Sequence, residues 1–191
     1  YVPDTLRAAF EETLCSRVEK LQTGNGMEDG VGVGPLVNDS AVAKVERQVE
    51  DAREKGAGVP IGGARLTEGD HANGHFFAPT VLTDVNDEMA IYREETFGPV
   101  APVISYEDPE QVVQLANDTN YGLAAYVYTR DISVAMRAFE GLRFGIIGIN
   151  DVNPTSASVP FGGMGDSGVG REGGHEGISE YLETKTGGFA I

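Results

Sequence analysis

The sequence predicts an α/β fold built on a mostly parallel sheet with helices on both faces. Short apolar or β-branched segments alternate with helical patterns through the later part of the chain, and this alternation is typical of βαβ crossovers. A mostly parallel sheet is buried on both faces, so helices are expected on each of them. The 191 residues suffice for one substantial core. We expect one domain over residues 1–180 and a terminal strand over residues 181–191.

The first predicted helix covers residues 3–22. Pro3 suits a first helical turn because its fixed φ is already helical, and the glycines at positions 24 and 26 end the pattern. Apolar residues recur at helical spacing at Leu6, Phe10, Leu14, Val18 and Leu21. Residues 27–37 are glycine-rich and aperiodic, so a loop is expected there.

A second helix is predicted over residues 39–56, with N-cap candidates just before it and Gly56 as its end. Its residues expected to face the core are Val42, Val45 and Val49. Strands are predicted at residues 59–61, 80–82, 99–104, 124–129 and 145–149. Further helices are predicted over residues 109–117 and 131–142. The last of them has Asp131 as its cap, and its core-facing residues are expected to be Ile132, Ala135, Met136 and Phe139.

Residues 150–174 lose all periodicity and are rich in Gly, Pro, Ser and Asn. An ordered loop of this length inside a domain is usually functional. The stretch from residue 181 to residue 191 is short and apolar enough for an edge strand. An unpaired edge exposes backbone donors and acceptors, which favours strand addition across a subunit interface.

The formal net charge of −16 and the pI near 4.4 make nucleic acid and anionic membrane unlikely partners, because a polyanionic surface repels both. We interpret the charge as a solvated acidic surface, with adaptation to high salt as the alternative. No apolar run is long enough to span a membrane, and the N-terminus lacks a secretion signal. The chain starts without Met, so it is expected to begin inside a longer protein or to be processed. A single Cys fits a cytoplasmic protein.

Two features that could carry chemistry favour bland interpretations. Cys15 lies in the middle of the first predicted helix with no base or cation beside it, so we interpret it as a structural thiol. The histidines at positions 71, 75 and 175 have no metal-ligand spacing, so no metal site is predicted. His71 and His75 are expected to be exposed to solvent.

The segment Gly163-Met164-Gly165-Asp166-Ser167-Gly168 formally satisfies the dinucleotide pattern G-x-G-x-x-G. That fingerprint needs a strand before it and a helix after it. Glycine continues at positions 170, 173 and 174, and such density is unfavourable to a helix. We therefore reject a Rossmann phosphate loop here.

Residues 94–99, Glu-Glu-Thr-Phe-Gly-Pro, precede a predicted strand. Such a turn presents carboxylates and an aromatic ring to a cleft at a strand end, as a ribose hydroxyl acceptor beside an aromatic face. The equally weighted alternative is a solvated acidic turn with Phe97 in the core.

This segment and four others together resemble the aldehyde dehydrogenase superfamily. The others are Gly34-Pro35-Leu36, Phe76-Phe77-Ala78-Pro79-Thr80, Asn120-Tyr121-Gly122-Leu123-Ala124 and Pro160-Phe161-Gly162-Gly163 with residues 167–172. The resemblance implies residues 1–180 as part of the catalytic domain and residues 181–191 as part of an oligomerisation arm. The nucleophilic Cys, the base Glu, the oxyanion-hole Asn and the cofactor domain of such enzymes have no counterparts here. No catalytic residue is therefore assigned to this chain, and Cys15 does not inherit the nucleophile's role.

The resemblance carries cofactor and substrate positions over to this chain. Glu95 matches the carboxylate that accepts hydrogen bonds from the nicotinamide ribose, Phe97 the aromatic beside the nicotinamide, and Lys44 a helix residue near the adenosine ribose. Thr155 and Phe161 fall at positions that line the aldehyde pocket. The implied cofactor is NAD or NADP, and the implied partner is a small aldehyde. A homo-oligomer, dimer or tetramer, formed through the terminal strand is also implied.

Residues 150–156, 172–177 and 180–185 resemble bacterial or archaeal succinate-semialdehyde dehydrogenases. The hydroxyl of Thr155 favours a polar substrate end. Members usually carry Lys where this chain has Gly165. In the family, a Cys thiolate attacks the aldehyde, hydride passes to the cofactor, and Glu-activated water releases the carboxylic acid. The chain alone is therefore expected to be inactive. A stand-alone binding or assembly protein with the same fold is the alternative, and an upstream continuation of the reading frame would argue against it.

Overall fold

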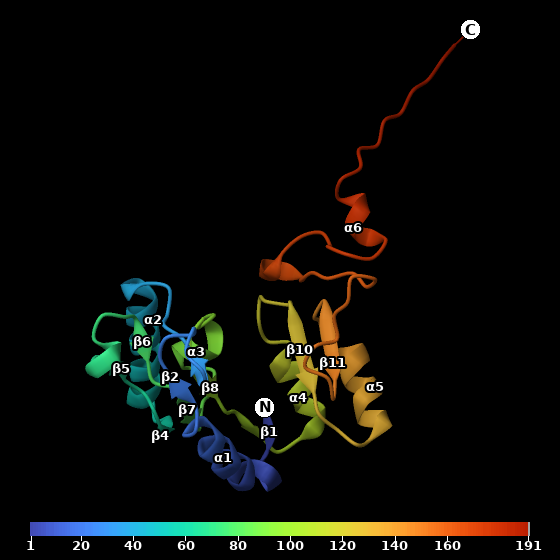
Figure 1. The fold of residues 1–191 in the computed structure, drawn as a ribbon. Helices are drawn as coiled ribbons and strands as arrows, with labels where there is room; N and C mark the ends of the chain where they lie inside the picture. The colour runs from blue at the N-terminus through green and yellow to red at the C-terminus, as the bar shows by residue number, and fades with distance from the viewer. Residues whose placement is uncertain (191) are drawn as a thin grey trace. The chain divides into compact units, whose positions relative to one another are not determined.

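The computed structural model describes residues 1–190 and divides into two compact units, unit 1 (Tyr1–Pro109) and unit 2 (Glu110–Ile191). The helices in chain order are α1 (Asp4–Val18), α2 (Asp39–Glu54), α3 (Ala90–Arg93), α4 (Pro109–Ala116), α5 (Ile132–Gly141) and α6 (Glu176–Ser179), with short 3-10 turns at Gly69–His71 and Gly165–Ser167 (Figure 1). The strands are β1 (Val2–Pro3), β2 (Gln22–Thr23), β3 (Val31–Val33), β4 (Gly58–Ile61), β5 (Arg65–Leu66), β6 (Phe76–Phe77), β7 (Thr80–Thr83), β8 (Val100–Pro102), β9 (Ser105–Tyr106), β10 (Ala124–Val127) and β11 (Ile146–Ile149).

The predicted α/β class with helices on both faces of a sheet is confirmed in unit 1. Its largest sheet has the order β4-β7-β8. Neighbouring residues of a strand point to opposite faces, and in β7 the fully buried Leu82 packs with α2 side chains. The fully buried Val81 packs instead with Leu14 and Val18 of α1. One strand therefore joins two apolar layers.

The pairing is mostly parallel, as predicted, but it is divided among several short sheets. Parallel pairs join β1 to β9, β2 to β3, β7 to β8 and β10 to β11. The pairs β4–β7 and β5–β6 are antiparallel. A parallel connection needs a long crossover, whereas the excursion between β4 and β7 holds only the β5–β6 pair and a 3-10 turn.

Helix α2 forms as predicted. The Asn38 side chain accepts a hydrogen bond from the Ala41 amide at 2.9 Å and caps the first turn. Val42, Val45 and Val49 are fully buried in the main core of unit 1. Gly56 follows the last turn with φ +98°, a backbone conformation that suits glycine and ends a helix.

Helix α1 is shorter than predicted. It begins at Asp4, with Pro3 before it, and ends at Val18 because Gln22–Thr23 leave the helix to pair with β3. That pairing also places a strand inside the predicted loop 27–37. Of the predicted apolar face, Leu14 and Val18 pack on the sheet, whereas Leu6, Phe10 and Leu21 are exposed.

Unit 2 contains the parallel pair β10–β11 with α4 and α5. The Asp131 carboxylate caps α5 as predicted, accepting hydrogen bonds from the Ser133 and Val134 amides. The predicted core face of α5 is wrong in part. Ala135 is buried, together with Ala138, but the larger apolar side chains Ile132, Met136 and Phe139 are exposed. The small alanines allow the helix to approach its neighbours closely, and in the described part of unit 2 its larger apolar side chains stay uncovered.

The predicted C-terminal edge strand does not form within this chain. Among residues 181–190 no strand is present after α6, and the chain runs out extended at its red end in Figure 1. Ile191, the last residue of the prediction, lies outside the described residues. A strand requires a hydrogen-bonded neighbour, and the part of this chain that is described supplies none to these residues.

Candidate functional site

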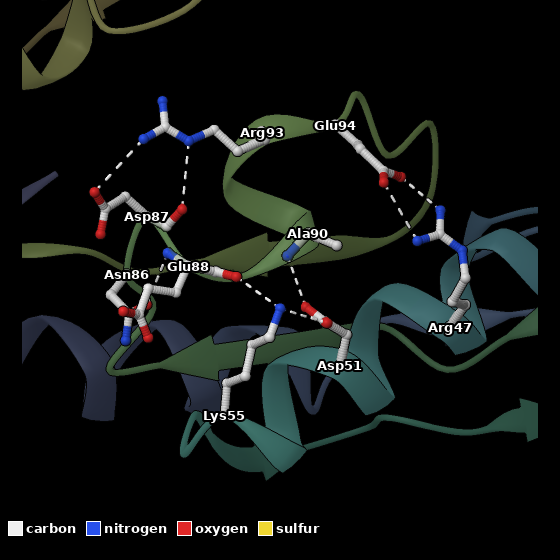
Figure 2. A network of polar contacts seen from close by, with 9 residues as sticks. All are labelled: Arg47, Asp51, Lys55, Asn86, Asp87, Glu88, Ala90, Arg93 and Glu94. Atoms are coloured by element: carbon white, nitrogen blue, oxygen red, sulfur yellow. Dashed lines mark hydrogen bonds and ion pairs between the residues drawn. The ribbon is translucent and has the colours of Figure 1, made fainter.

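The turn 94–98, between α3 and β8 in unit 1, carries two of the predicted cofactor residues. Its first residue, Glu94, is bound to helix α2. Arg47 donates from both terminal nitrogens to the two Glu94 carboxylate oxygens, at 2.5 and 3.3 Å, as Figure 2 shows. The Gln48 amide donates to the same carboxylate at 3.2 Å. Glu94 is therefore occupied as an anchor of the turn.

The electrostatics of Glu94 agree with this role. The hydrogen bond from Arg47 lowers the pKa of the Glu94 carboxyl, the Gln48 hydrogen bond adds to the effect, and partial burial opposes it. The positive charges of Arg47 and Lys44 also lower this pKa. The carboxylate is thus held in its charged form.

Gly98, at the other end of the turn, lies against the same helix. A Cβ at this position would come within 2.6 Å of Val45 Cγ2, and Val45 is fully buried. Glycine is therefore needed for the close approach. The turn is fastened to α2 at both ends.

Glu95 and Phe97 lie between these two anchors and remain free. Both are exposed, and the Phe97 side chain is 79% accessible. Phe97 has φ +47°, an uncommon conformation for a residue with a side chain and one that often marks a functional site. Phe97 is therefore not a core residue. The structure favours the presented carboxylate and ring over the acidic turn with a buried aromatic.

Lys44 is half-buried on α2, one helical turn before Gln48. Within residues 1–190 its ammonium group forms no ion pair. The structure thus brings Lys44, Glu95 and Phe97 into one region of unit 1 through α2 and the turn 94–98.

The predicted pocket residues Thr155 and Phe161 belong to unit 2. Thr155 is exposed, and its hydroxyl donates to Asn153 Oδ1 at 2.9 Å. The hydroxyls of Ser156 and Ser158 lie 2.9 Å apart in the same stretch. Phe161 exchanges two backbone hydrogen bonds of 2.7 Å with Glu172, and the residue is 41% accessible.

The long loop is nevertheless ordered by specific contacts. Met164 N–H donates to the Gly122 carbonyl at 3.0 Å, and Asp166 N–H donates to the Asn120 carbonyl at 3.0 Å. The Ser167 hydroxyl accepts from Gly122 N–H at 3.0 Å. The segment around residue 122 and the loop around residue 165, both of which carried the family resemblance, therefore form one cluster.

The contacts in this cluster explain why glycine is present at position 165. Its φ is +59°, and a Cβ here would overlap the Asn120 carbonyl oxygen. A lysine at this position would have to shift the backbone of the loop. Glycine therefore allows the close docking of the loop on Asn120.

The rejected dinucleotide fingerprint is confirmed as something else. Gly165–Ser167 forms one 3-10 turn, and the next α-helix along the chain begins only at Glu176. Glycine-rich backbone at positions 163–168 therefore lacks the helix N-terminus that cradles a pyrophosphate.

Cys15 shows no sign of activation. It is half-buried on α1, and burial raises the pKa of its thiol, with the charges of Glu11 and Glu19 raising it further. A raised pKa disfavours the thiolate nucleophile. The prediction of a structural thiol therefore agrees with its environment.

The histidine prediction needs correction for two of its members. His71 is half-buried, with Nε2 2.8 Å from the Thr23 carbonyl and its ring edge-on to Phe76. His75 is half-buried, 3.2 Å from Asp39 Oδ1. Close packing of β5, β6 and their neighbours covers a loop that looked polar in sequence. No cluster of potential metal ligands occurs in residues 1–190.

Sequence reasoning missed Arg47 and Gln48 as supports of the site. Arg47 and Glu94 are separated by 47 positions, and no local pattern connects them. The only sequence signal was their place on the α2 face that continues through Lys44.

In the described chain, no helix is both long and apolar enough to cross a membrane.

The sequence pattern of the aldehyde dehydrogenase family matches residues 1–187. The chain is 46% identical to a Pseudomonas putida glutarate-semialdehyde dehydrogenase, covering 97% of this chain and 37% of the relative. It is 47% identical to an Escherichia coli succinate-semialdehyde dehydrogenase named for NADP(+), covering 97% of this chain and 38% of that one. The chain therefore spans little more than a third of these relatives.

Solved structures agree. Staphylococcus aureus betaine aldehyde dehydrogenase in complex with NAD+ has a TM-score of 0.91 and 40% identity, covering 96% of this chain and 37% of that one. Burkholderia pseudomallei succinate-semialdehyde dehydrogenase has a TM-score of 0.88 and 46% identity, covering 94% and 36%.

Proposed function

This chain belongs to the aldehyde dehydrogenase family, and from that premise we propose that it is the C-terminal part of an NAD(P)-dependent enzyme that oxidises an aldehyde to the carboxylic acid. The family match over residues 1–187 supports the assignment. The observation that carries it to a site is the turn 94–98, which keeps Glu95 and Phe97 free while its ends are fastened to α2.

The residues of unit 1 fit a nicotinamide cofactor. The exposed Glu95 carboxylate offers acceptor oxygens for ribose hydroxyls, and the exposed Phe97 ring offers an apolar face for a flat heterocycle. Lys44, on the adjacent helix face and in no ion pair within residues 1–190, is proposed to lie near the adenosine ribose. The cofactor, when bound, supplies the hydride acceptor of the reaction.

The contribution of these residues is positional. Glu95 would hold the ribose by hydrogen bonds, and Phe97 would limit movement of the nicotinamide ring. Holding a reacting group in one geometry lowers the barrier by removing orientational freedom before reaction. A turn fastened at both ends suits this task better than a mobile loop.

For the substrate we propose a small aldehyde with an anionic far end, succinic semialdehyde in particular. The relatives at 45–47% identity are named for glutarate, succinate and aspartate semialdehydes and for 3-sulfolactaldehyde, and all of these carry a negative group. The hydroxyl of Thr155, which here donates to Asn153 Oδ1, and those of the nearby serine pair would supply donors for such a group after turning toward it. Phe161 would form an apolar wall of the same pocket.

Two further properties belong to this proposal. The exposed Tyr181, Leu182 and Phe189 on the extended tail would be covered in a homo-oligomer formed by pairing of residues 181–191 with another subunit. The single cysteine supports a cytoplasmic location.

Turnover measurements test the proposed function. The full-length protein that carries this chain is expected to form NAD(P)H from succinic semialdehyde, whereas residues 1–191 alone are not, because the nucleophile and base are missing. Thr155→Val in the full-length protein should raise KM for succinic semialdehyde about tenfold, since one lost hydrogen bond to a charged group is worth about 1.5 kcal/mol, and leave KM for an uncharged aldehyde unchanged. Cys15-independent turnover by residues 1–191 would overturn the proposal of an incomplete site.

A further inference from the structure

We propose that Arg47, supported by Gln48, is a positioning residue that sets the turn from which Glu95 and Phe97 reach the cofactor. The inference rests on the proposed function for the role of those two residues. No sequence motif points to Arg47, because its contact with the site joins residues that lie 47 positions apart.

Arg47 shares one side of α2 with two other charged residues that contact the segment around α3. Arg47 and Asp51 of α2 and Lys55 at its C-cap follow one another at four-residue intervals, so they lie on one side of the helix. All three reach the segment around α3, as Figure 2 shows. Asp51 accepts from the Ala90 amide at 2.7 Å, and Lys55 donates to the Glu88 carbonyl at 2.6 Å. Helix α2 thus holds the start of α3 by these contacts.

Arg47 binds the chain at the point where α3 ends. The short helix stops at Arg93, and Glu94 already has extended geometry as its cap. At this point the backbone leaves α3 and enters the turn, and here Arg47 engages both Glu94 carboxylate oxygens. A planar guanidinium fixes orientation as well as distance when it binds a carboxylate with two nitrogens. The Glu94 side chain therefore cannot rotate freely while the pair is formed.

The ion pair between Arg47 and Glu94 acts on the position of the turn 94–98 more than on the stability of the fold. Arg47 and Glu94 are both substantially accessible, at 54% and 43% of their side chains, and exposed ion pairs contribute little to the stability of a fold. Asp51, Lys55 and Val45 already connect α2 to the segment from Glu88 to Gly98. The Arg47–Glu94 pair is therefore not needed to hold these elements together. What it adds is control of the residue immediately before Glu95.

The chain supplies a matched control on the same helix. Arg53 pairs with Glu50 at 2.6 Å, with side-chain exposures of 45% and 56%. This pair has the same residue types and similar accessibility, but both partners belong to α2. Arg53→Ala should therefore reproduce the loss of an exposed helix ion pair without disturbing the turn 94–98.

The test uses the full-length protein with the variants Arg47→Ala, Arg47→Lys, Arg53→Ala and the charge exchange Arg47→Glu with Glu94→Arg. The first readout is amide hydrogen exchange of residues 94–98 without cofactor. The second is the KM for NAD(P)+ beside the KM for aldehyde. Arg47→Ala should accelerate exchange in the turn and raise the cofactor KM about twofold, the scale of one lost exposed pair, with the aldehyde KM unchanged. Arg47→Lys should be intermediate, and the charge exchange should recover most of both effects.

Arg53→Ala should leave both readouts at the wild-type value. The inference is overturned if Arg47→Ala leaves exchange in residues 94–98 unchanged, or loosens the turn without raising the cofactor KM. Equal effects of Arg47→Ala and Arg53→Ala would also overturn it. A separate variant, Glu95→Gln, tests the proposed function itself: if it leaves the cofactor KM unchanged, the assignment of the site fails, whatever exchange in Arg47→Ala shows.

Discussion

At the scale of single residues, two adjacent carboxylates have different fates. Glu94 is bound by Arg47 and Gln48 on α2, whereas Glu95 stays exposed without a partner in the described chain. Identical side chains next to each other cannot be distinguished by composition or periodicity. The family resemblance assigned Glu95 to the nicotinamide ribose, and in the structure this carboxylate is exposed while Arg47 binds its neighbour Glu94. The role of Glu95 toward the cofactor stays a prediction.

Stability of unit 1 should depend on pH through these carboxylates. The Arg47 hydrogen bond lowers the pKa of Glu94 in the folded state below its ordinary value of 4.5. A lowered folded pKa means that the stabilisation is complete above the unfolded value and is lost as pH falls through the folded value. Asp51 behaves alike, because the Ala90 amide and then Lys55 lower its pKa.

Urea unfolding at pH 7 and at pH 3 checks this prediction. Glu94→Gln should cost about 0.5 kcal/mol at pH 7, the scale of an exposed pair, and much less at pH 3. Asp51→Asn should follow the same pattern with a larger cost, because Asp51 is the less exposed of the two and accepts a backbone N–H. A cost of Glu94→Gln that is equal at both pH values would contradict the argument.

At the scale of elements, the two units differ in how well their sheets are covered. The β4-β7-β8 sheet has α1 on one face and α2 on the other, with fully buried Val81 and Leu82 between them. In unit 2 the helix α5 buries only alanines and leaves Ile132 and Phe139 exposed. A two-stranded pair with so little buried area is marginal by itself. The apolar side chains on α5 suit a surface that further protein covers.

Amide exchange of the isolated chain should therefore be uneven. In residues 1–191 alone, amides of α5, β10 and β11 are expected to exchange at least about tenfold faster than those of α2 and β7, a difference of about 1.4 kcal/mol in local opening. In the full-length protein the difference should shrink as added contacts protect unit 2. Equal protection of both units in the isolated chain would show that α5 needs no further covering.

At the scale of the whole molecule, the net charge of −16 is the dominant property. Like charges repel in the compact state more than in the expanded one, so the charge opposes folding. The ion pairs on the surface, such as Arg7 with Glu11 and Arg53 with Glu50, offset part of this. Salt screens both the general repulsion and the surface ion pairs. Because acidic groups are in excess, the repulsion is the larger of the two effects.

Added salt should consequently stabilise the chain. Screening shortens from about 10 Å at 0.1 M to about 3 Å at 1 M ionic strength. Between these concentrations of NaCl we expect Tm to rise by roughly 4 °C, which for a chain of this size corresponds to about 1 kcal/mol or slightly more. A substantially larger rise would favour the alternative of adaptation to high salt. A flat or falling Tm would show that surface ion pairs outweigh the general repulsion.

The sequence by itself determined the elements whose signals are local. Helix α2 has its cap, its valines at helical spacing and its terminating glycine within one stretch, and Asp131 likewise marks the start of α5. The ordered family motifs also identified the residues of the turn and of the long loop. These features depend on neighbours within a few positions, which is why they can be read along the chain.

Only the tertiary structure decided the features that depend on distant partners. It showed that Arg47 binds Glu94, that Gly98 must clear Val45, and that Gly165 docks on Asn120. It also showed the antiparallel β4–β7 pair and an α5 with exposed large side chains. Burial and pairing are properties of what lies opposite a residue in space, and a period along the chain specifies a face without specifying what covers it.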